Sequence, residues 1–219
     1  MRVGILISGF GSNMMKLIES CENKDSKASI ELVFSNNPDA EGLKYAKSKG
    51  IRIVSIDHNS YENRIEFDNQ VNKVLLDHDI EFICNAGFMR IHSDDFVNKW
   101  FNKHLNVHPS LLPSFKGLNT HKKAIEAGVK FAGCTVHMVR SGVDEGQIIG
   151  QAVTSVNQSD NEKLLAAKVL ELEHRLYPVC LHLFAEDLIK VNLDKINYKE
   201  EAIKIFDKFV NRVDFEKEN

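Results

Sequence analysis

Short apolar runs that alternate with helix-like segments limit the fold of this chain more than any other feature. Runs at residues 2–8, 30–37, 51–56 and 80–88 have the length and apolar content of buried strands. A helix-like segment follows each run, and a fifth strand is expected at residues 104–108. Strands that alternate with helices predict an α/β fold, built on a doubly wound, mostly parallel sheet with helices on both faces.

The second half of the chain predicts a different arrangement. Apolar runs at residues 134–139 and 147–153 are separated by the glycine-bounded loop RSGVDEG, which indicates an antiparallel C-terminal hairpin. A long amphipathic helix should follow this hairpin. The end of the chain is richly charged and contains one amphipathic segment. We therefore expect one domain at residues 1–188, and a tail at residues 189–219 that packs on it or extends from it.

Several residues mark where helices should begin or be disturbed. Asp39 is predicted to cap the second helix, Ser60 to open the third, and Ser93 to start a short fourth. Ser159 and Glu162 have the spacing of a capping box for the long helix that follows the hairpin. Pro178 is expected to kink or interrupt that helix, because proline lacks the backbone donor.

Charge and cysteine content exclude several classes of protein. The net charge of −3 over 219 residues gives no general attraction to nucleic acid or to an anionic membrane. No apolar run is long enough to span a membrane, and no secretory signal begins the chain. The four cysteines are far apart and form no CxxC pair, so zinc spacing is absent and no metal site is expected. We expect a soluble cytoplasmic protein with buried, reduced cysteines.

The sequence SGFGSN, at residues 8–13, lies between the first strand and its helix. Gly9 and Gly11 allow backbone conformations that other residues resist. The amides of Gly11, Ser12 and Asn13 would stand at a helix N-terminus, where an anion is favoured. The motif is neither GxGxxG nor a Walker A loop, so it does not indicate a dinucleotide or a nucleoside triphosphate. A single phosphate fits the pattern, and a plain tight turn fits it equally.

Asn106 and His108 are two residues apart in the strand LNVH, so their side chains project from one face. Pro109 favours extended backbone at His108, which places the pair at the carboxyl end of a strand, where open α/β sheets bind ligands. An imidazole transfers protons near neutral pH, and an amide donates to a developing oxyanion. Asp144, in the glycine-rich loop, would orient His108 if it reached that ring. The alternative is a structural role for the amide and the ring, and a solvated carboxylate.

Seven separated blocks resemble, in order, the glycinamide ribonucleotide formyltransferase family. These blocks are ISGFGSN, VFSNNPDAEGLKYA, AGFMRI, LNVHPSLLPSFKG, TVHMV, VDEGQII and EHRLYP. The resemblance covers about residues 1–184 and marks residues 1–188 as a formyltransferase catalytic domain, with a ribonucleotide-binding N-terminal half and a folate-binding C-terminal half. It implies transfer of a formyl group from 10-formyltetrahydrofolate, as a co-substrate, to the amine of glycinamide ribonucleotide in purine synthesis.

The resemblance also implies roles for individual residues. Asn106 and His108 would donate to the oxygen of a tetrahedral intermediate, and Asp144 would hold His108 in its charged form. His108 or a bound water would relay the proton from the amine to the departing folate. The implied ribonucleotide site consists of Gly11, Ser12 and Asn13 for the phosphate, Glu173 for the ribose hydroxyls, and Gly87 and Pro109 for the glycinamide arm.

The implied folate site combines two loops and two arginines. One loop contributes Met89, Arg90, Ile91 and His92; the other contributes Arg140, Ser141, Gly142, Val143 and Asp144, with Asn106 between them. Arg64 and Arg90 would lie near the anionic glutamate tail. Two residues depart from the family pattern. His92 stands where an aliphatic residue is expected, and Glu145 replaces a small residue beside Asp144.

Three other functions compete with this interpretation. Methionyl-tRNA formyltransferase and formyltetrahydrofolate hydrolase share the asparagine, histidine and aspartate, but each normally has a further domain that is not expected here. A protein that binds a nucleotide or folate without catalysis is the third. We expect small molecules as partners, with no nucleic acid and no membrane, and a monomer or weak homodimer.

Overall fold

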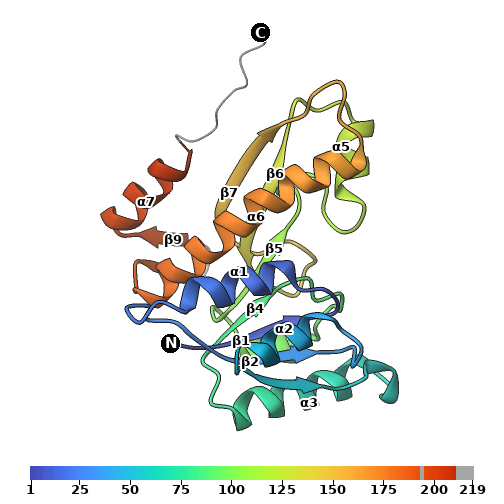
Figure 1. Ribbon diagram of the computed structural model, residues 1–219, viewed down its shortest axis with the longest axis vertical. Coiled ribbons are helices and arrows are strands. Elements are labelled where there is room, and N and C mark those ends of the chain that lie inside the picture. The colour runs from blue at the N-terminus through green and yellow to red at the C-terminus, as the bar shows by residue number, and fades with distance from the viewer. Residues whose placement is uncertain (193–194, 211–219) are drawn as a thin grey trace.

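A seven-stranded sheet forms the centre of the protein (Figure 1). The computed structural model describes residues 1–192 and 195–210. The strand order is β3-β2-β1-β4-β5-β6-β7. The strands from β1 to β5 run parallel, whereas β6 and β7 are antiparallel. The strands are β1 (Arg2–Ile7), β2 (Ser29–Ser35), β3 (Arg52–Ser55), β4 (Phe82–Asn85), β5 (His104–His108), β6 (Phe131–Met138) and β7 (Ile148–Ser155). The predicted mostly parallel sheet with an antiparallel hairpin is confirmed.

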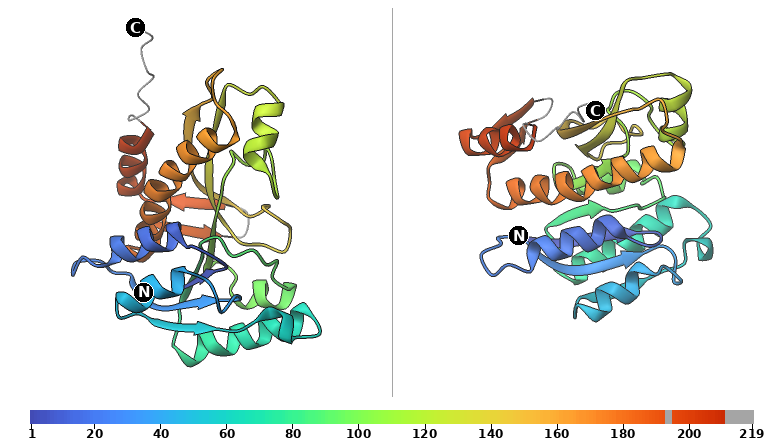
Figure 2. Two further views of the ribbon diagram at one scale, coloured as in Figure 1. Left: turned by 45° about the vertical axis from the view of Figure 1, so that its right-hand side comes forward. Right: turned by 45° about the horizontal axis from the view of Figure 1, so that its top comes forward.

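Helices cover both faces of this sheet, as the sequence predicts (Figure 2). One core cluster joins the sheet to α1, α2, α5 and α6, and a second joins the other face to α3 and α4. The strand β1 contributes to both clusters, because Ile5 faces the first and Leu6 the second. The helices are α1 (Ser12–Cys21), α2 (Gly42–Ser48), α3 (Arg64–Asp77), α4 (Asp94–Lys99), α5 (Thr120–Glu126) and α6 (Glu162–Ala185), with a 3-10 turn at His58–Ser60.

The predicted helix starts are only partly correct. Ser93 does cap α4, because its side chain accepts a hydrogen bond from the backbone N–H of Phe96. Asp39 does not cap α2, which begins at Gly42 without a side-chain cap. Ser60 belongs to the 3-10 turn, and the cap of α3 is Asn63. In both wrong predictions a local turn places the capping candidate outside the helix.

The long helix α6 also begins later than the capping box predicts. Its cap is Asn161, whose side chain accepts from the N–H of Leu164, whereas Ser159 precedes the helix. The side chain of Asp160 accepts from the N–H of Asn157, so a turn occupies this segment. Pro178 does not interrupt α6, which includes all residues of Glu162–Ala185.

The C-terminal segment packs on the edge strand β7. It forms a hairpin, β8 (Ile189–Asn192) and β9 (Lys195–Tyr198), followed by α7 (Glu200–Val210). The Tyr198 hydroxyl donates to the Ile149 carbonyl over 3.0 Å, and the Phe206 ring lies where a side chain at Gly150 would collide with it. The sequence indicates the amphipathic segment but not the hairpin. Residues 211–219 of the predicted tail lie outside the described residues.

The strand order reverses between β1 and β4, which is the place where open α/β folds bind their ligands. The strand β1 lies between β2 and β4, so the connections on its two sides run to opposite edges. Loops that follow β1 and β4 therefore diverge and leave a crevice at their carboxyl ends. The parallel pairing of Asn85 with Asn106 brings the end of β5 to the same edge. Within residues 1–192 and 195–210, no helix is long and apolar enough to cross a membrane.

The pairing of β6 with β7 depends on a glycine at position 133. A Cβ atom there would stand 1.9 Å from the Ala152 carbonyl oxygen on the neighbouring strand. We expect Gly133→Ala to lower the free energy of unfolding by about 1 to 3 kcal/mol, because the strands must separate locally. Urea unfolding followed by circular dichroism measures this loss. Gly9→Ala is the matched control, because no atom lies within 4 Å of its added carbon; equal stability of the two variants would contradict the prediction.

Candidate active site

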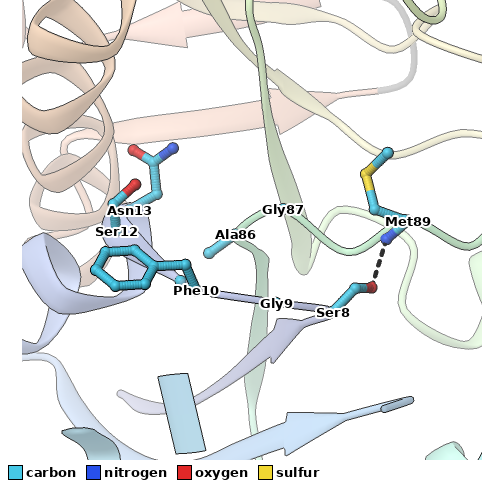
Figure 3. A pocket seen from close by; sticks show the side chains of 9 residues that line it. Ser8, Gly9, Phe10, Ser12, Asn13, Ala86, Gly87 and Met89 are labelled. Carbon is cyan, nitrogen blue, oxygen red and sulfur yellow. Dashed lines mark hydrogen bonds between the residues drawn. The ribbon is translucent and has the colours of Figure 1, made fainter. Parts of the chain in front are cut away.

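A cavity of about 250 Å³ occupies the crevice between the loops that follow β1 and β4 (Figure 3). The loop after β1 supplies one wall and the backbone at Ala86 and Gly87 supplies the other. The side chains of Ser12 and Asn13 reach it from the first turn of α1. The complete lining is Ser8, Gly9, Phe10, Gly11, Ser12, Asn13, Ala86, Gly87 and Met89.

The N-terminus of α1 gives this cavity a preference for an anion. Gly11 has a φ of 74°, a left-handed conformation that glycine adopts without steric cost, and Ser12 is the first helical residue. The first intrahelical bond runs from the N–H of Met15 to the Gly11 carbonyl. The backbone N–H groups before Met15 therefore have no carbonyl partner within the helix, and the helix dipole adds partial positive charge.

Ser8 ties the cavity wall to its neighbours. Its hydroxyl donates to the Asn36 side-chain carbonyl over 2.6 Å, and its oxygen accepts from the N–H of Met89 over 2.7 Å (Figure 3). The first bond links the ends of β1 and β2, and the second links the end of β1 to the loop after β4. These bonds fix the width of the crevice, and they leave the side chain of Ser8 without a free proton for a ligand.

Glu173 lies beneath the cavity as a buried carboxyl group on α6. Its Oε2 accepts from the side-chain amide of Asn13 over 2.6 Å. Burial raises its pKa to about 7, and the hydrogen bond from Asn13 only partly opposes this effect. Among the described residues, the Oδ1 atom of Asn13 is buried without a partner. Glu173 and Asn13 therefore form one polar unit next to the anion-binding helix end.

His108 meets the Asp144 carboxylate at the end of β5. Its Nδ1 lies 3.3 Å from Asp144 Oδ2, and its Nε2 donates to the Phe115 carbonyl over 3.0 Å. Both ring nitrogens thus face acceptor oxygens, and only the doubly protonated ring supplies a proton to each. Asp144 also accepts from the backbone N–H of Gly117 over 2.9 Å. The predicted encounter of His108 and Asp144 occurs in the structure.

Asn106 lies beside this pair and is oriented by a histidine that the sequence analysis did not select. Its Nδ2 lies 3.2 Å from His137 Nε2, and His137 Nδ1 donates to the Met138 carbonyl over 2.9 Å. Burial lowers the pKa of His137, so its neutral ring accepts from the Asn106 amide. The antiparallel pairing of Asn106 with His137 was the missing information. A predicted pairing of β5 with β6 would have placed His137 beside Asn106.

The residues expected around a folate divide into exposed and buried groups. Met89, Arg90 and Ile91 are exposed on the loop after β4, whereas the His92 side chain is buried. The guanidinium of Arg140 donates to Asn102 and lies 4.1 Å from the centre of the Phe101 ring. The His92 ring differs from its three loop neighbours because it packs inside the protein, between Phe88 and Phe96.

The remaining predicted residues occupy the surroundings of the site. Pro109 directly follows His108, and Gly87 lines the cavity. Arg64 is exposed at the first position of α3. On the loop before Asp144, Ser141 and Val143 are exposed, and Gly142 is half-buried.

The two departures beside the site have different structural settings. Glu145 pairs with Lys116 over 2.9 Å, so its charge is directed toward the other loop that frames His108 rather than toward the His108 ring. The His92 ring packs between Phe88 and Phe96, which belong to the second core cluster. Neither residue contacts Asn106 or Asp144 through a hydrogen bond in the described part of the chain.

The arrangement can bind an anion and stabilise negative charge a short distance away. Asn106 presents an amide and His108 an imidazole ring on one face of β5, and both groups can donate hydrogen bonds. The Asp144 carboxylate lies 3.3 Å from this ring on the side away from Phe115. In the described ranges 1–192 and 195–210, no group of three histidine, cysteine or acidic side chains is placed to hold a metal ion.

Comparison with known proteins places the chain among formyl transferases. The Formyl transferase family model matches residues 1–181. The chain is 36% identical over 192 residues to the phosphoribosylglycinamide formyltransferase of Escherichia coli, covering 88% of this chain and 91% of that protein. It is 49% identical over 190 residues to the trifunctional purine biosynthetic protein adenosine-3 of Gallus gallus, covering 87% of this chain. The match spans only 19% of that longer relative.

Solved structures agree with these relatives. The phosphoribosylglycinamide formyltransferase of Anaplasma phagocytophilum is similar with a TM-score of 0.85 and 41% identity, covering 91% of this chain and 94% of that one. Glycinamide ribonucleotide transformylase 1 of Symbiobacterium toebii has a TM-score of 0.88 and 37% identity, with the same coverage of 91% and 94%. The described sheet and helices therefore have the formyltransferase fold.

The raised pKa of Glu173 predicts a pH-dependent stability. The folded protein holds this proton up to a pKa of about 7, whereas the unfolded chain releases it near the usual glutamate pKa of 4.5. The protonated carboxyl therefore contributes stability that is fully present below about pH 4.5 and lost as the pH rises through about 7. We expect Glu173→Gln to remove up to about 3 kcal/mol of this dependence. Urea unfolding at steps of about one pH unit between pH 5 and 8 measures this dependence. Parallel pH profiles of stability for variant and wild type would contradict the prediction.

Proposed function

The chain belongs to the formyl transferase family, and from this premise we propose that it formylates the amine of glycinamide ribonucleotide with 10-formyltetrahydrofolate. The observation that carries the proposal is the meeting of His108 and Asp144 over 3.3 Å beside Asn106. Family members use a folate co-substrate, and the named relatives with the largest coverage are phosphoribosylglycinamide formyltransferases. The proposed product is formylglycinamide ribonucleotide, an intermediate of purine synthesis.

The ribonucleotide is assigned to the cavity at the start of α1. Its phosphate would accept from backbone N–H groups at Gly11, Ser12 and Asn13, where the helix dipole favours an anion. Glu173 would accept from the ribose hydroxyls, and Gly87 and Pro109 would flank the glycinamide arm. The cavity's position between the loops after β1 and β4 supports this orientation, because β5 ends at the same edge.

The folate is assigned to the other side of Asn106. Met89, Arg90 and Ile91 would contact the pterin from one loop, and the segment from Arg140 to Asp144 would face it from the other. Arg64 and Arg90 carry positive charge that suits the anionic glutamate tail. The exposure of Met89 and Ile91 supports the assignment, because two neighbouring apolar side chains are free to cover a flat ring.

The proposed reaction is acyl transfer without a covalent enzyme intermediate. The amine of the ribonucleotide attacks the formyl carbon, and the carbon–nitrogen bond forms as the carbonyl electrons move to oxygen. Asn106 and His108 donate to this oxygen and stabilise its negative charge. The proton lost by the amine then reaches N10 of the folate through His108 or water, and the bond from the carbon to N10 breaks.

His108 must exchange one hydrogen bond before it can act on this oxygen. Its Nε2 proton is directed at the Phe115 carbonyl, and its Nδ1 proton at Asp144. A substrate oxygen would replace Phe115 as the acceptor, while Asp144 continues to hold the ring in its charged form. Asp144 has a left-handed backbone with a φ of 54°, and its side chain contacts both His108 and the N–H of Gly117.

We also propose that the protein acts on small molecules in the cytoplasm, as a monomer or a weak homodimer. Methionyl-tRNA formyltransferase activity and formyltetrahydrofolate hydrolysis remain the alternative reactions of the same polar residues. The cavity at the helix N-terminus favours a small phosphorylated acceptor over a charged tRNA or water.

The proposed reaction can be tested with purified protein and 10-formyltetrahydrofolate. We expect loss of the folate's formyl group to require glycinamide ribonucleotide and to yield one formylated product, followed by absorbance and mass spectrometry. Charged initiator methionyl-tRNA and buffer alone serve as competing acceptors. Faster formylation of the tRNA, equal formyl loss in buffer, or ligand binding without turnover would contradict the proposal and support one of the alternatives.

Removal of either member of the charged pair should abolish most of the turnover. We expect His108→Ala and Asp144→Asn each to lower kcat by about 10²- to 10³-fold, because a donor to the oxyanion or its orienting partner is lost. Steady-state kinetics measure this change, and circular dichroism checks the fold. Asp77→Asn, at an exposed ion pair on α3, is the matched control and should retain normal turnover. Near-normal activity in either site variant would refute the assignment.

A further inference from the structure

A buried acid and histidine lie beneath the loop that carries Met89 and Ile91. Asp68 of α3 is 2% exposed and His92 is 5% exposed. His92 Nδ1 lies 3.3 Å from Asp68 Oδ1, and the other carboxylate oxygen accepts from the backbone N–H of Ser93. Asp68 thus binds two consecutive residues at the end of this loop and connects them to α3.

The His92 ring also forms part of an aromatic stack. It lies parallel to Phe88, with ring centres 5.1 Å apart at 13°, and parallel to Phe96, with centres 4.3 Å apart at 9°. The His104 ring of β5 meets its edge at 5.1 Å. A flat ring with a donor nitrogen at its edge fits this place, because one side chain fills the stack and also reaches Asp68.

The stack holds both ends of an exposed stretch of chain. Phe88 and His92 are buried, whereas residues 89–91 between them are exposed, with Met89 at 65% and Ile91 at 56%. A second bond restrains the first residue of this stretch, since the N–H of Met89 donates to Ser8. The exposed side chains are therefore carried by a short segment with fixed ends, and their positions depend on where His92 stands.

The charge of Asp68 makes this attachment depend on a donor at position 92. Burial raises the pKa of Asp68, but the hydrogen bonds from His92 and Ser93 outweigh burial and lower its pKa overall. A buried carboxylate that loses one of two donors is left partly unsatisfied, and the surrounding chain moves to solvate it. The residues most able to move at this site are 89–91, because they are exposed, whereas α3 and Phe88 are held in the second core cluster.

We propose that His92 is a positioning residue for the folate, through its stack with Phe88 and Phe96 and its bond to Asp68. It holds residues 89–91 as a surface that accepts the flat pterin ring. This inference rests on the proposed function, and it gives His92 an indirect role in place of the direct contact that the sequence predicts. The ribonucleotide cavity and the His108–Asp144 pair are formed by other elements, so His92 should affect only the folate side.

The test separates the two contributions of the ring. His92→Asn keeps a donor but removes the stack, and His92→Phe keeps a ring but removes the donor. Asp68→Asn keeps the shape of the side chain but replaces one accepting oxygen with a donor amide, so the bonds from His92 and Ser93 cannot both be kept. We expect each variant to raise the Kd for 10-formyl-5,8-dideazafolate about tenfold by titration calorimetry. The KM for the folate should rise to match, while kcat and the KM for glycinamide ribonucleotide stay within about twofold of wild type.

Two controls make the result specific. His182→Asn applies the same change at an exposed histidine on α6 and should leave all constants unchanged. The double variant Asp68→Asn/His92→Phe should bind the analogue about as well as the weaker single variant, because the two residues act through one bond. Thermal unfolding verifies that each variant is folded, and Asp68→Asn provides the test if the His92 variants do not fold.

The outcomes distinguish this inference from the function on which it rests. An unchanged Kd in folded Asp68→Asn and His92 variants would overturn the positioning role while wild-type turnover still supports the proposed function. Equal losses in kcat and in both KM values would overturn it as well, because they indicate a general structural role. Wild-type binding without turnover would refute the proposed function, yet the Kd values would still decide the role of His92. Failure of the wild type to bind the analogue would refute both.

Discussion

The contact between Asp144 and His108 depends on the antiparallel pairing of β6 with β5. This register sets His137 opposite Asn106 and Thr135 opposite His108. The chain leaves β6 beside the beginning of β5, so the loop after it must fold back across the sheet for Asp144 to reach His108. Two contacts hold this loop in place. The N–H of Gly117 donates to Asp144, and Lys116 forms an ion pair with Glu145. Two loops far apart in sequence thereby enclose one ring.

The same aspartate has two histidine neighbours with different chemistry. His108 has an acceptor at each ring nitrogen and is suited to a positive charge. His137 has the Met138 carbonyl on one side and the Asn106 amide on the other, and burial keeps it neutral. Its Nε2 lies 3.6 Å from Asp144 Oδ1, too far for a good hydrogen bond. One histidine can therefore carry charge to a ligand while the other fixes the amide beside it.

Much of the architecture could be predicted from the sequence, because strands buried on two faces leave continuous apolar runs. The helix starts at Gly42, Arg64 and Glu162 could not, since several polar residues near each one compete for the capping position and local turns decide among them. The motif at residues 8–13 indicated the helix end that lines the cavity. The spacing of Asn106 and His108 indicated their common face.

The parts that the sequence did not reveal depend on contacts between distant segments. Nothing near His137 in the sequence indicates its role, because its partner, the Asn106 amide, lies across the sheet. The resemblance placed His92 in the folate site together with Met89 and Ile91. Those two neighbours are exposed, whereas the His92 ring turns inward to Asp68. An irregular loop has no side-chain periodicity, so the sequence does not predict which of its side chains point inward. The buried carboxylate that binds His92 comes from α3, which is distant in sequence.

We propose that Asn106 and His108 converge on one carbonyl as it becomes tetrahedral, while Asp144 holds the His108 ring from behind. A crystal structure with glycinamide ribonucleotide and an unreactive folate analogue, whose N10 substituent is a stable tetrahedral hydrate, examines this directly. The account predicts one oxygen of the hydrate within about 3 Å of both the Asn106 amide and the His108 ring, with Asp144 still on the far side of that ring. A hydrate bound away from these groups, with His108 still donating to Phe115, would contradict it.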